Sequence, residues 1–297
     1  MSATTSRAST SEFHDHPPTA APGSDGFYAD PVVYDILHAP GTIDEVDGLE
    51  RIARRYSPRA LEAGARWLEP ACGTARHLRV LQKRRKRVLG FDAEPSMVAY
   101  AKSQLIPQTG GGVYAARLDN FLRVRPKRLA TFRSDFAFNL INTIRHARTD
   151  REMLDHLSAM ARVLAPGGTY AVGLSLSLYG CESATEDVWS GSRGRVKVTQ
   201  VVQFMPPEGP HAGRGTRGRD EVVISHLTIR DGKKTRHTDS KYLLRTYSLA
   251  QWDRLIARSA MRIVGVTDQD GEPIEPSGLG YSVFVLEARA AGGGGGT

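Results

Sequence analysis

Apolar runs of strand length alternate with amphipathic stretches through the first part of the chain, a pattern that predicts strands joined by helices. Strands are expected at Ala65–Glu69, Arg87–Phe91, Gly112–Ala116, Asp135–Leu140 and Thr169–Leu174. Helices are expected at Thr74–Lys83, Ser96–Gln104 and Asp150–Leu164. Such alternation with short connections indicates a doubly wound α/β fold, in which helices cover both faces of a parallel sheet. Ligands of these sheets bind at the carboxyl ends of the strands.

After residue 186 the apolar runs become longer, and turn residues such as Asp231-Gly232 separate them, which indicates antiparallel hairpins. Three strands are expected in this inserted region, at Val196–Phe204, Glu221–Arg230 and Thr235–Arg245. Ser248 suits the N-cap of a helix that ends near Ser259. Two more strands follow, at Met261–Thr267 and Tyr281–Ala288. The sequence therefore predicts a mostly parallel, seven-stranded sheet with an inserted antiparallel β region.

The expected organisation is a single domain over residues 25–290 between two tails. Residues 1–24 are rich in Ser, Thr, Ala and Pro without periodicity and are expected to be disordered, and the glycine run within 291–297 is expected to be a flexible tail. The domain divides into a helical cap (25–60), a ligand-binding core (61–180), the antiparallel insertion (186–247), and a closing helix and strand pair (248–289).

Composition narrows the class of protein. The 297 residues are 40% apolar, enough to bury a large core. We find no apolar run of membrane-spanning length and no apolar signal segment, so we expect no membrane association and a cytoplasmic location. The two cysteines give no disulfide framework, and we predict no metal site because His14 and His16 fall in the tail.

The turn after the first strand carries the most specific chemistry in the chain. The strand ends on Glu69, small residues follow at Ala71, Gly73 and Ala75, and the next strand is followed by Asp92. This arrangement is typical of a nucleoside cofactor site. A dinucleotide would require G-x-G-x-x-G, and Glu69 would repel its pyrophosphate. S-adenosylmethionine has no phosphate and carries an ammonium and a sulfonium, which a carboxylate attracts.

These residues resemble the first motifs of the class I, Rossmann-like S-adenosylmethionine-dependent methyltransferases. The first motif is an acidic residue followed by small-x-Gly-x-small, here Glu69 to Ala75, and the second acidic residue is Asp92. Pro166-Gly167-Gly168 matches a third motif before the fifth strand, so the resemblance extends from about Ala65 to Leu176. It implies an antiparallel last strand, S-adenosyl-L-methionine as cofactor, S-adenosyl-L-homocysteine as product, and a ribose contact from Asp92.

The resemblance also implies a set of cofactor-binding residues: Tyr28, Tyr34, Glu69, Ala71, Cys72, Gly73, Arg76, Asp92, Ala93, Met97, Leu118, Asp119 and Asn139. The family often has an Asp after strand three that accepts from the adenine amino group, but Arg117 occupies that position here. Leu118 is then expected to pack on the adenine, and Asp119 or Asn120 to accept from it. Tyr28 and Tyr34 are expected to close over the cofactor, although ordinary helix-face tyrosines would fit the sequence equally well.

Asn142 and His146 follow the fourth strand and are expected beside the methyl donor, where either could orient or deprotonate the acceptor. A histidine that only packs the loop is the alternative. Arg245 and Tyr247 resemble a pair in small-molecule members of the family, so we expect them to contact the substrate and include Tyr247 among the candidate catalytic residues.

Positive charge is concentrated in the insertion. Residues 191–245 contain twelve Lys or Arg and five Asp or Glu, which is most of the net charge of +8. This excess suggests an anionic acceptor, although a solvated surface would look the same. The basic cluster Lys83–Arg87 is interpreted as a solvated helix end, because the chain has no Asn-Pro-Pro-Tyr or Asp-Pro-Pro-Tyr run and no RNA-binding module. Nucleic acid is therefore an unfavoured partner.

The combined prediction is an S-adenosylmethionine-dependent methyltransferase that acts on nitrogen or oxygen of a small molecule. Two alternatives remain, an RNA or DNA methyltransferase that uses the basic insertion, and a non-catalytic cofactor-binding protein, which Arg117 suggests. The absent G-x-G-x-x-G argues against a nicotinamide-dependent reductase. The sequence does not specify the acceptor or the oligomeric state.

Overall fold

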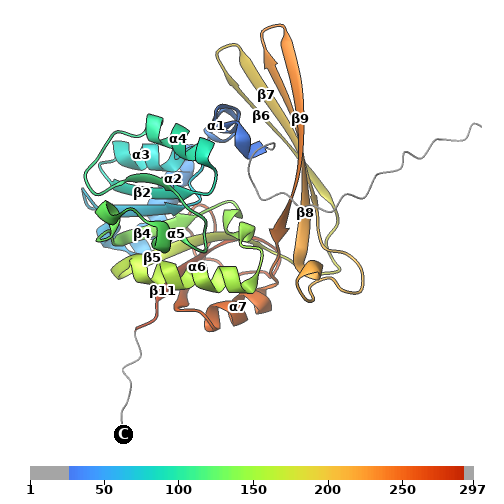
Figure 1. Cartoon of the computed structure of the whole chain (residues 1–297). Coiled ribbons are helices and arrows are strands. Elements are labelled where there is room, and N and C mark those ends of the chain that lie inside the picture. The colour runs from blue at the N-terminus through green and yellow to red at the C-terminus, as the bar shows by residue number, and fades with distance from the viewer. Residues whose placement is uncertain (1–26, 291–297) are drawn as a thin grey trace, which may run out of the picture.

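The computed structural model describes residues 27–290, and the predicted tails at 1–24 and 291–297 lie outside this range. The described part of the chain contains two β-sheets together with the helices that pack on them (Figure 1). One has seven strands and belongs to an α/β body, and the other has four strands and stands beside it. Within the described residues, no helix has both the length and the hydropathy needed to cross a membrane.

The seven-stranded sheet has the order β10-β11-β5-β4-β1-β2-β3. The strands are β1 Arg66–Pro70, β2 Arg87–Asp92, β3 Gly112–Ala115, β4 Ser134–Asn139, β5 Leu164–Leu176, β10 Met261–Thr267 and β11 Gly280–Ala288. β11 is antiparallel to both of its neighbours, while the pairs from β5 to β3 are parallel. The predicted fold class, including the antiparallel last strand, is confirmed.

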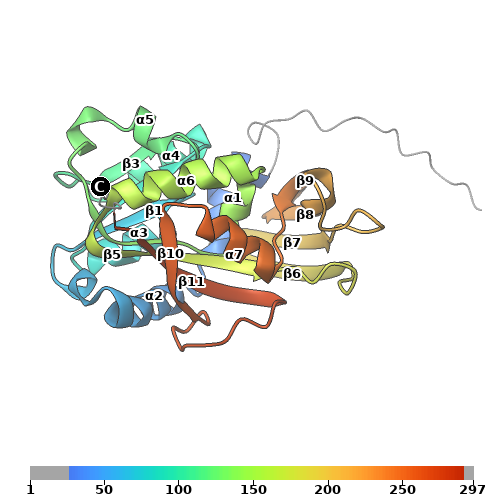
Figure 2. The same cartoon turned by 90° about the horizontal axis from the view of Figure 1, so that it is seen from below.

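Helices cover both faces of this sheet (Figure 2). One face carries α2 (Thr42–Tyr56), α3 (Arg76–Lys83) and α4 (Pro95–Gln104), and the other carries α5 (Phe121–Val124), α6 (Asp150–Val163) and α7 (Leu249–Ala257). Each face has its own core, with Trp67 fully buried in the first and Trp252 in the second. Ser248 caps α7 in a reciprocal capping box with Gln251, so the expected N-cap is present.

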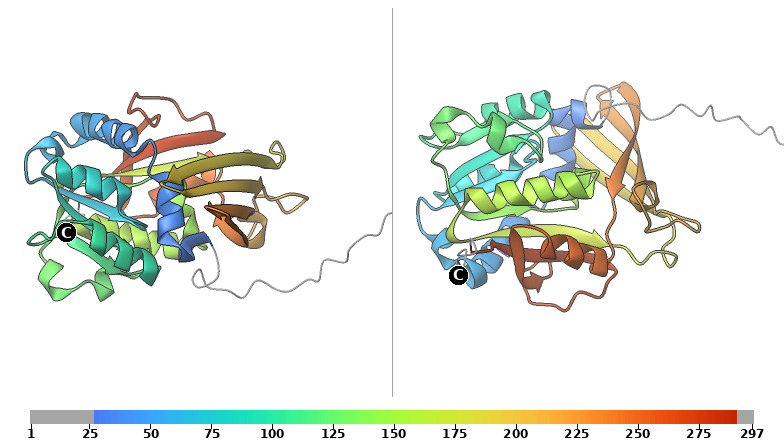
Figure 3. Two further views of the ribbon diagram at one scale, coloured as in Figure 1. Left: turned by 90° about the horizontal axis from the view of Figure 1, so that it is seen from above. Right: turned by 60° about the horizontal axis from the view of Figure 1, so that its bottom comes forward.

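The inserted sheet has the antiparallel order β6-β7-β8-β9 and extends away from the body (Figures 1 and 3). Its strands are β6 Thr185–Arg193, β7 Val196–Met205, β8 Asp220–Asp231 and β9 Lys234–Arg245. The sequence predicted β7, β8 and β9 but not β6. The reason is that β6 is an edge strand, largely exposed and rich in polar residues, and only its pairing with β7 makes it a strand.

The N-terminal segment fills the space between the two sheets. The short helix η1 (Phe27–Ala29) precedes α1 (Pro31–His38). α1 begins with Asp30 as its N-cap and Pro31 in its first turn. Apolar side chains of α1 pack against β7 and β8, and the helix also contacts α4 and β6 (Figure 3). α1 therefore joins the body to the inserted sheet above the carboxyl ends of β1 and β2.

Candidate active site

Two adjoining cavities lie at the carboxyl ends of the parallel strands, where the fold predicts a ligand. Both share a wall made of Tyr28, Tyr34, Ala71, Thr143 and His146. The first cavity extends toward the loops that follow β2 and β3. The second, of about 300 Å³, extends past the ends of β1 and β4 to the inserted sheet. All the cofactor-binding residues expected from the sequence line one cavity or the other.

The turn after β1 has an unusual backbone that brings it close to the cavities. Ala71, Gly73 and Ala75 all have left-handed conformations, with φ of 49°, 51° and 59°. An L-residue in this conformation costs roughly 1–2 kcal/mol, so two alanines at such positions store strain at the site. A Cβ on Gly73 would lie 3.5 Å from the Tyr34 ring. Glycine there keeps the turn free of a side chain beneath the tyrosine.

Asp92 ties the end of β2 to this turn. Its carboxylate accepts hydrogen bonds from the Gly73 amide at 2.7 Å and the Glu94 amide at 2.9 Å. Burial raises the pKa of Asp92 to about 6. The carboxylate lines the first cavity and retains lone pairs beyond the two backbone bonds, as a ribose contact requires.

Glu69 and Asn139 present unpartnered oxygen atoms to the second cavity. Glu69 is buried, with Oε1 bonded to His77 Nδ1 at 2.7 Å and Oε2 without a partner among the described residues. Asn139 donates from Nδ2 to the Pro70 carbonyl at 2.8 Å, and its Oδ1 is also unpartnered. Buried oxygens of this kind need a donor. A ligand ammonium supplies three, so these residues fit the amino group of S-adenosylmethionine.

The loop after β3 differs from the family pattern because Arg117 occupies the position at which an Asp is common. Arg117 is exposed and its guanidinium bonds the Asp119 carboxylate at 3.2 Å, so the two charges offset each other at the rim of the first cavity. Asn120 accepts from the Arg117 amide at 3.0 Å and is not among the lining residues. Leu118 lines the cavity, and its carbonyl oxygen is fixed by His156 at 2.9 Å. Leu118 and Asp119 remain the candidate adenine contacts.

His146 stands in the wall that both cavities share. Its Nε2 lies 3.2 Å from the Tyr28 hydroxyl oxygen. Its ring stacks on the ring of Tyr242 on β9, with 5.7 Å between the ring centroids. Burial, with a smaller contribution from the nearby Arg145 and Arg148, lowers the pKa of His146 to about 4. The imidazole is therefore neutral at pH 7, which suits a hydrogen-bonding group and not an efficient proton acceptor.

The other candidate catalytic residues have structural partners. Asn142 lines the second cavity, but its amide donates to Ser175 Oγ at 2.9 Å and accepts from the Ser175 amide at 2.6 Å. Both polar ends thus clamp the loop to β5, which also holds Asn142 at φ 62°. Both ends of the Asn142 amide are therefore engaged in holding the loop.

Arg245 and Tyr247 line neither cavity, contrary to the sequence prediction. Arg245 is buried beside Asp150 and donates to the Thr216 carbonyl at 2.5 Å. Tyr247 is fully buried, and the guanidinium carbon of Arg219 lies over its ring, 4.7 Å from the ring centroid. These interactions fasten the inserted sheet to the body, so the structure places both residues away from the candidate site.

The sequence prediction missed the outer half of the second cavity, which we call the outer chamber. It is lined by Phe27, His38, Asp187, Trp189, Phe204, Tyr242 and Leu244. Asp187 and Trp189 belong to β6, the strand that was not predicted. The signal in the sequence was the alternation of Asp187 and Trp189 two residues apart, which places them on one face of a strand.

Comparison with known proteins agrees with this geometry. Residues 68–168 match a family model described as a methyltransferase domain. No curated protein matches the sequence significantly. Among solved structures, DesVI of Streptomyces venezuelae is 20% identical, covers 87% of this chain and 98% of its own, and has a TM-score of 0.63.

Two further structures have the same fold over nearly their whole length. The sugar N-methyltransferase KedS8 of Streptoalloteichus is 18% identical, with coverage of 94% and 100% and a TM-score of 0.64. SAM-bound CalS10 of Micromonospora echinaspora, an amino pentose methyltransferase, is 20% identical, with coverage of 83% and 92% and a TM-score of 0.57. The family match shows that the chain contains a methyltransferase domain at residues 68–168, and the strand order is that of the Rossmann-like class I fold.

Proposed function

We propose that this enzyme methylates an amine nitrogen of a small molecule that binds in the outer chamber. The observation that carries the proposal is the chemistry of the chamber wall. Aromatic side chains make up most of it, and Asp187 has the single formal charge among the described residues that line it. Aromatic faces and a carboxylate attract a cation. The cofactor, when bound, supplies a methyl group on a positively charged sulfur.

None of the described residues around the two cavities that the sequence suggested as a base is an efficient one. Burial lowers the pKa of His146 and of His38 to about 4, and Asn142 is committed to Ser175. A hydroxyl acceptor would need to lose its proton before or during transfer, whereas a neutral amine attacks with its own lone pair. As the acceptor nitrogen gains positive charge, the aromatic faces and Asp187 stabilise it by about 0.5–2 kcal/mol for each well-placed ring.

An amine acceptor agrees with the activities of KedS8, a sugar N-methyltransferase, and CalS10, an amino pentose methyltransferase. Both proteins resemble this chain in fold, at 18% and 20% sequence identity. We further propose that Tyr28, Tyr34, Glu69, Asp92 and Asn139 are among the residues that hold the cofactor. His146 would then orient the acceptor beside it.

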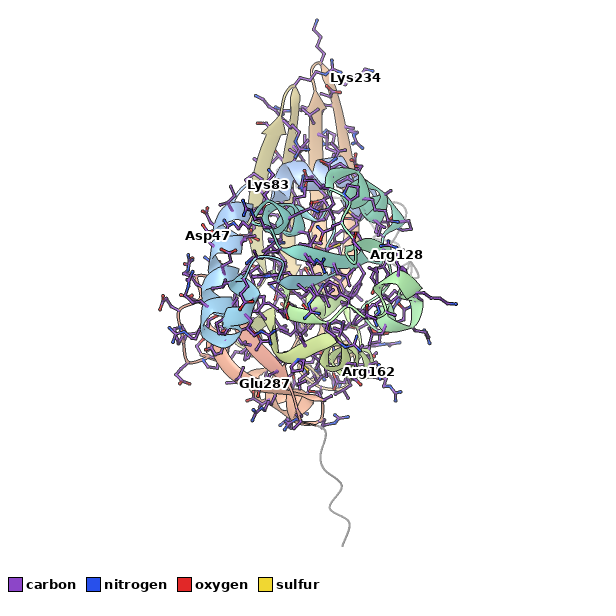
Figure 4. All side chains as sticks on the ribbon, turned by 90° about the vertical axis from the view of Figure 1, so that its left-hand side faces the viewer. Asp47, Lys83, Arg128, Arg162, Lys234 and Glu287 are labelled. Carbon is purple, nitrogen blue, oxygen red and sulfur yellow. The ribbon has the colours of Figure 1, made fainter. Side chains whose placement is uncertain are left out.

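The basic residues of the insertion give little support for an anionic acceptor or for nucleic acid. Arg193 binds Asp35, Arg236 binds Asp30, and Arg219 pairs with Asp150. Lys234 lies at the far tip of the inserted sheet (Figure 4). In the Lys83–Arg87 cluster, Lys86 is buried against backbone carbonyls. Much of the charge therefore holds the fold together or lies away from the outer chamber.

The proposal predicts that Asp187→Asn lowers kcat/KM for an amine acceptor by about threefold to fivefold, because a solvent-exposed carboxylate facing a developing cation contributes up to about 1 kcal/mol. Formation of S-adenosylhomocysteine is measured with a panel of amino sugars and the corresponding sugars that carry hydroxyl in place of the amine. Glu186→Gln is the matched control, since Glu186 is the preceding residue of β6 and its side chain bonds Gln203 on the other face. Turnover of hydroxyl acceptors alone, or equal losses in both variants, would contradict the proposal.

A further inference from the structure

A row of ionisable side chains runs from the cofactor turn to the N-terminal helices. His77 Nδ1 lies 2.7 Å from Glu69 Oε1, and His77 Nε2 lies 2.6 Å from Glu45 Oε2 on α2. Arg76 donates to the same Glu45 oxygen at 2.6 Å and to Thr42 Oγ1 at 2.9 Å. His77 and Glu69 are both buried, while Glu45 is partly exposed.

The two contacts of His77 require a doubly protonated ring. A neutral imidazole donates from one nitrogen only, so its other nitrogen would face a carboxylate lone pair to lone pair. The positive charge of Arg76 on α3 also acts on the ring, and the rings of His77 and of Phe138 on β4 are nearly perpendicular, with centroids 5.5 Å apart. Burial and Arg76 oppose protonation, but Glu69 and Glu45 outweigh them, and the pKa of His77 is raised. The same contacts lower the pKa of Glu45 to about 2 although burial opposes this.

The charged row fixes how Glu69 faces the cavity. With Oε1 held by His77, the unpartnered Oε2 is the atom left for a ligand. The imidazolium also offsets one of the two carboxylates: Glu45, Glu69, His77 and Arg76 together sum to zero charge. A neutral ring could donate to only one of the two carboxylates, so the clamp would open at Glu45 or at Glu69.

We propose that His77, as an imidazolium clamped between Glu45 and Glu69, is a positioning residue that holds Glu69 ready for the amino group of the cofactor. Glu45 completes the clamp and thereby couples helix α2 to the affinity for the cofactor. The inference concerns the cofactor half of the site and does not depend on the nature of the acceptor.

Calorimetry on the full chain with two ligands tests this role. S-adenosylhomocysteine carries the amino group, whereas methylthioadenosine has the adenosine part without the amino acid. We expect His77→Asn to weaken S-adenosylhomocysteine binding by about tenfold, the value of one charge-assisted hydrogen bond, and methylthioadenosine binding by less than about twofold. The advantage of the natural protein over the variant should shrink as the pH rises through the raised pKa of His77, because the ring then loses one of its two protons.

Glu45→Gln tests the far end of the clamp and should weaken S-adenosylhomocysteine binding severalfold with the same selectivity. Its control is Glu50→Gln on the same helix, because Glu50 pairs with Arg84 and lines neither cavity. Equal weakening of both ligands by His77→Asn would show a merely structural role and overturn the proposal, as would unchanged binding of S-adenosylhomocysteine. If His77→Asn does not fold, the Glu45→Gln result decides: a variant indistinguishable from Glu50→Gln overturns it.

Discussion

At the scale of single residues, burial sets the protonation states that the site uses. The pKa of His146 falls to about 4 and that of Asp92 rises to about 6, and in both cases burial is the largest cause. His77 is the exception, because two carboxylates outweigh its burial. None of these states follows from residue identity, since an exposed histidine and an exposed aspartate titrate near 6.5 and 3.9.

Asp92 gives a prediction for pH dependence. Its pKa in the folded protein, about 6, lies above the ordinary value of 3.8. The carboxylate is therefore ionised at pH 7 and becomes protonated as the pH falls through 6. Because a ribose hydroxyl donates to the ionised form, we expect S-adenosylhomocysteine binding to weaken by about tenfold between about pH 7 and pH 5. Titration calorimetry measures this.

For the free protein the sign is opposite. A buried carboxylate is destabilising while it is charged, so the contribution of Asp92 to the free energy of unfolding increases as the pH falls through 6. Asp92→Asn should bind the ligand weakly at every pH with a flatter profile. A profile for Asp92→Asn as steep as that of the natural protein would assign the dependence to another group.

At the scale of elements, the turn between β1 and α3 shows how local sequence and backbone geometry agree. Small residues at 71, 73 and 75 predicted a tight turn, and all three have left-handed backbone. β2 approaches this turn closely: a Cβ on Gly90 would lie 2.8 Å from the Cys72 sulfur and 2.7 Å from the Leu78 side chain. Gly90 is therefore required by the packing of the turn against β2.

This geometry predicts an unusual response to glycine. Ala71→Gly should leave the free energy of unfolding unchanged or raise it by up to about 1 kcal/mol, because the relief of left-handed strain offsets the flexibility gained by the unfolded chain. Ala99→Gly, at an exposed position within α4, should lower it by about 1 kcal/mol. Urea denaturation compares the two. Equal destabilisation would mean that the Ala71 backbone relaxes at little cost.

At the scale of the whole molecule, Asp35 joins the two sheets. It is fully buried on α1 and binds Arg79 of α3, Tyr100 of α4 at 3.1 Å, and Arg193 of β6 at 2.6 Å. Burial opposes its ionisation, but hydrogen bonds from Arg193 and Arg79 outweigh this and lower the pKa of Asp35. α1, which closes the cavities through Tyr34, is thereby fixed to the body and to the insertion together.

Asp35→Asn should therefore destabilise the fold by about 1–2 kcal/mol, since a neutral amide replaces the buried carboxylate that binds two partly exposed arginines. Hydrogen exchange should accelerate in α1 and in the β6–β7 hairpin more than in α7. Arg195→Ala, in the turn of the same hairpin, removes an exposed ion pair with Asp231 at the end of β8 and should have little effect. Uniform acceleration across the molecule would indicate global destabilisation and not a released joint.

The sequence by itself determined the features that depend on local backbone and on the sign of charge. The alternating pattern predicted the seven-stranded sheet, and small residues beside Glu69, followed by Asp92, indicated a cofactor without phosphate. Tertiary structure decided the rest: β6 became a strand by pairing with β7, and Asp187 and Trp189 came to face the cavity with it. Packing also buries Arg245 and Tyr247 away from the cavities, and burial keeps the His146 imidazole uncharged at pH 7. Such outcomes depend on which distant side chains exclude water from one another, and no local pattern encodes that.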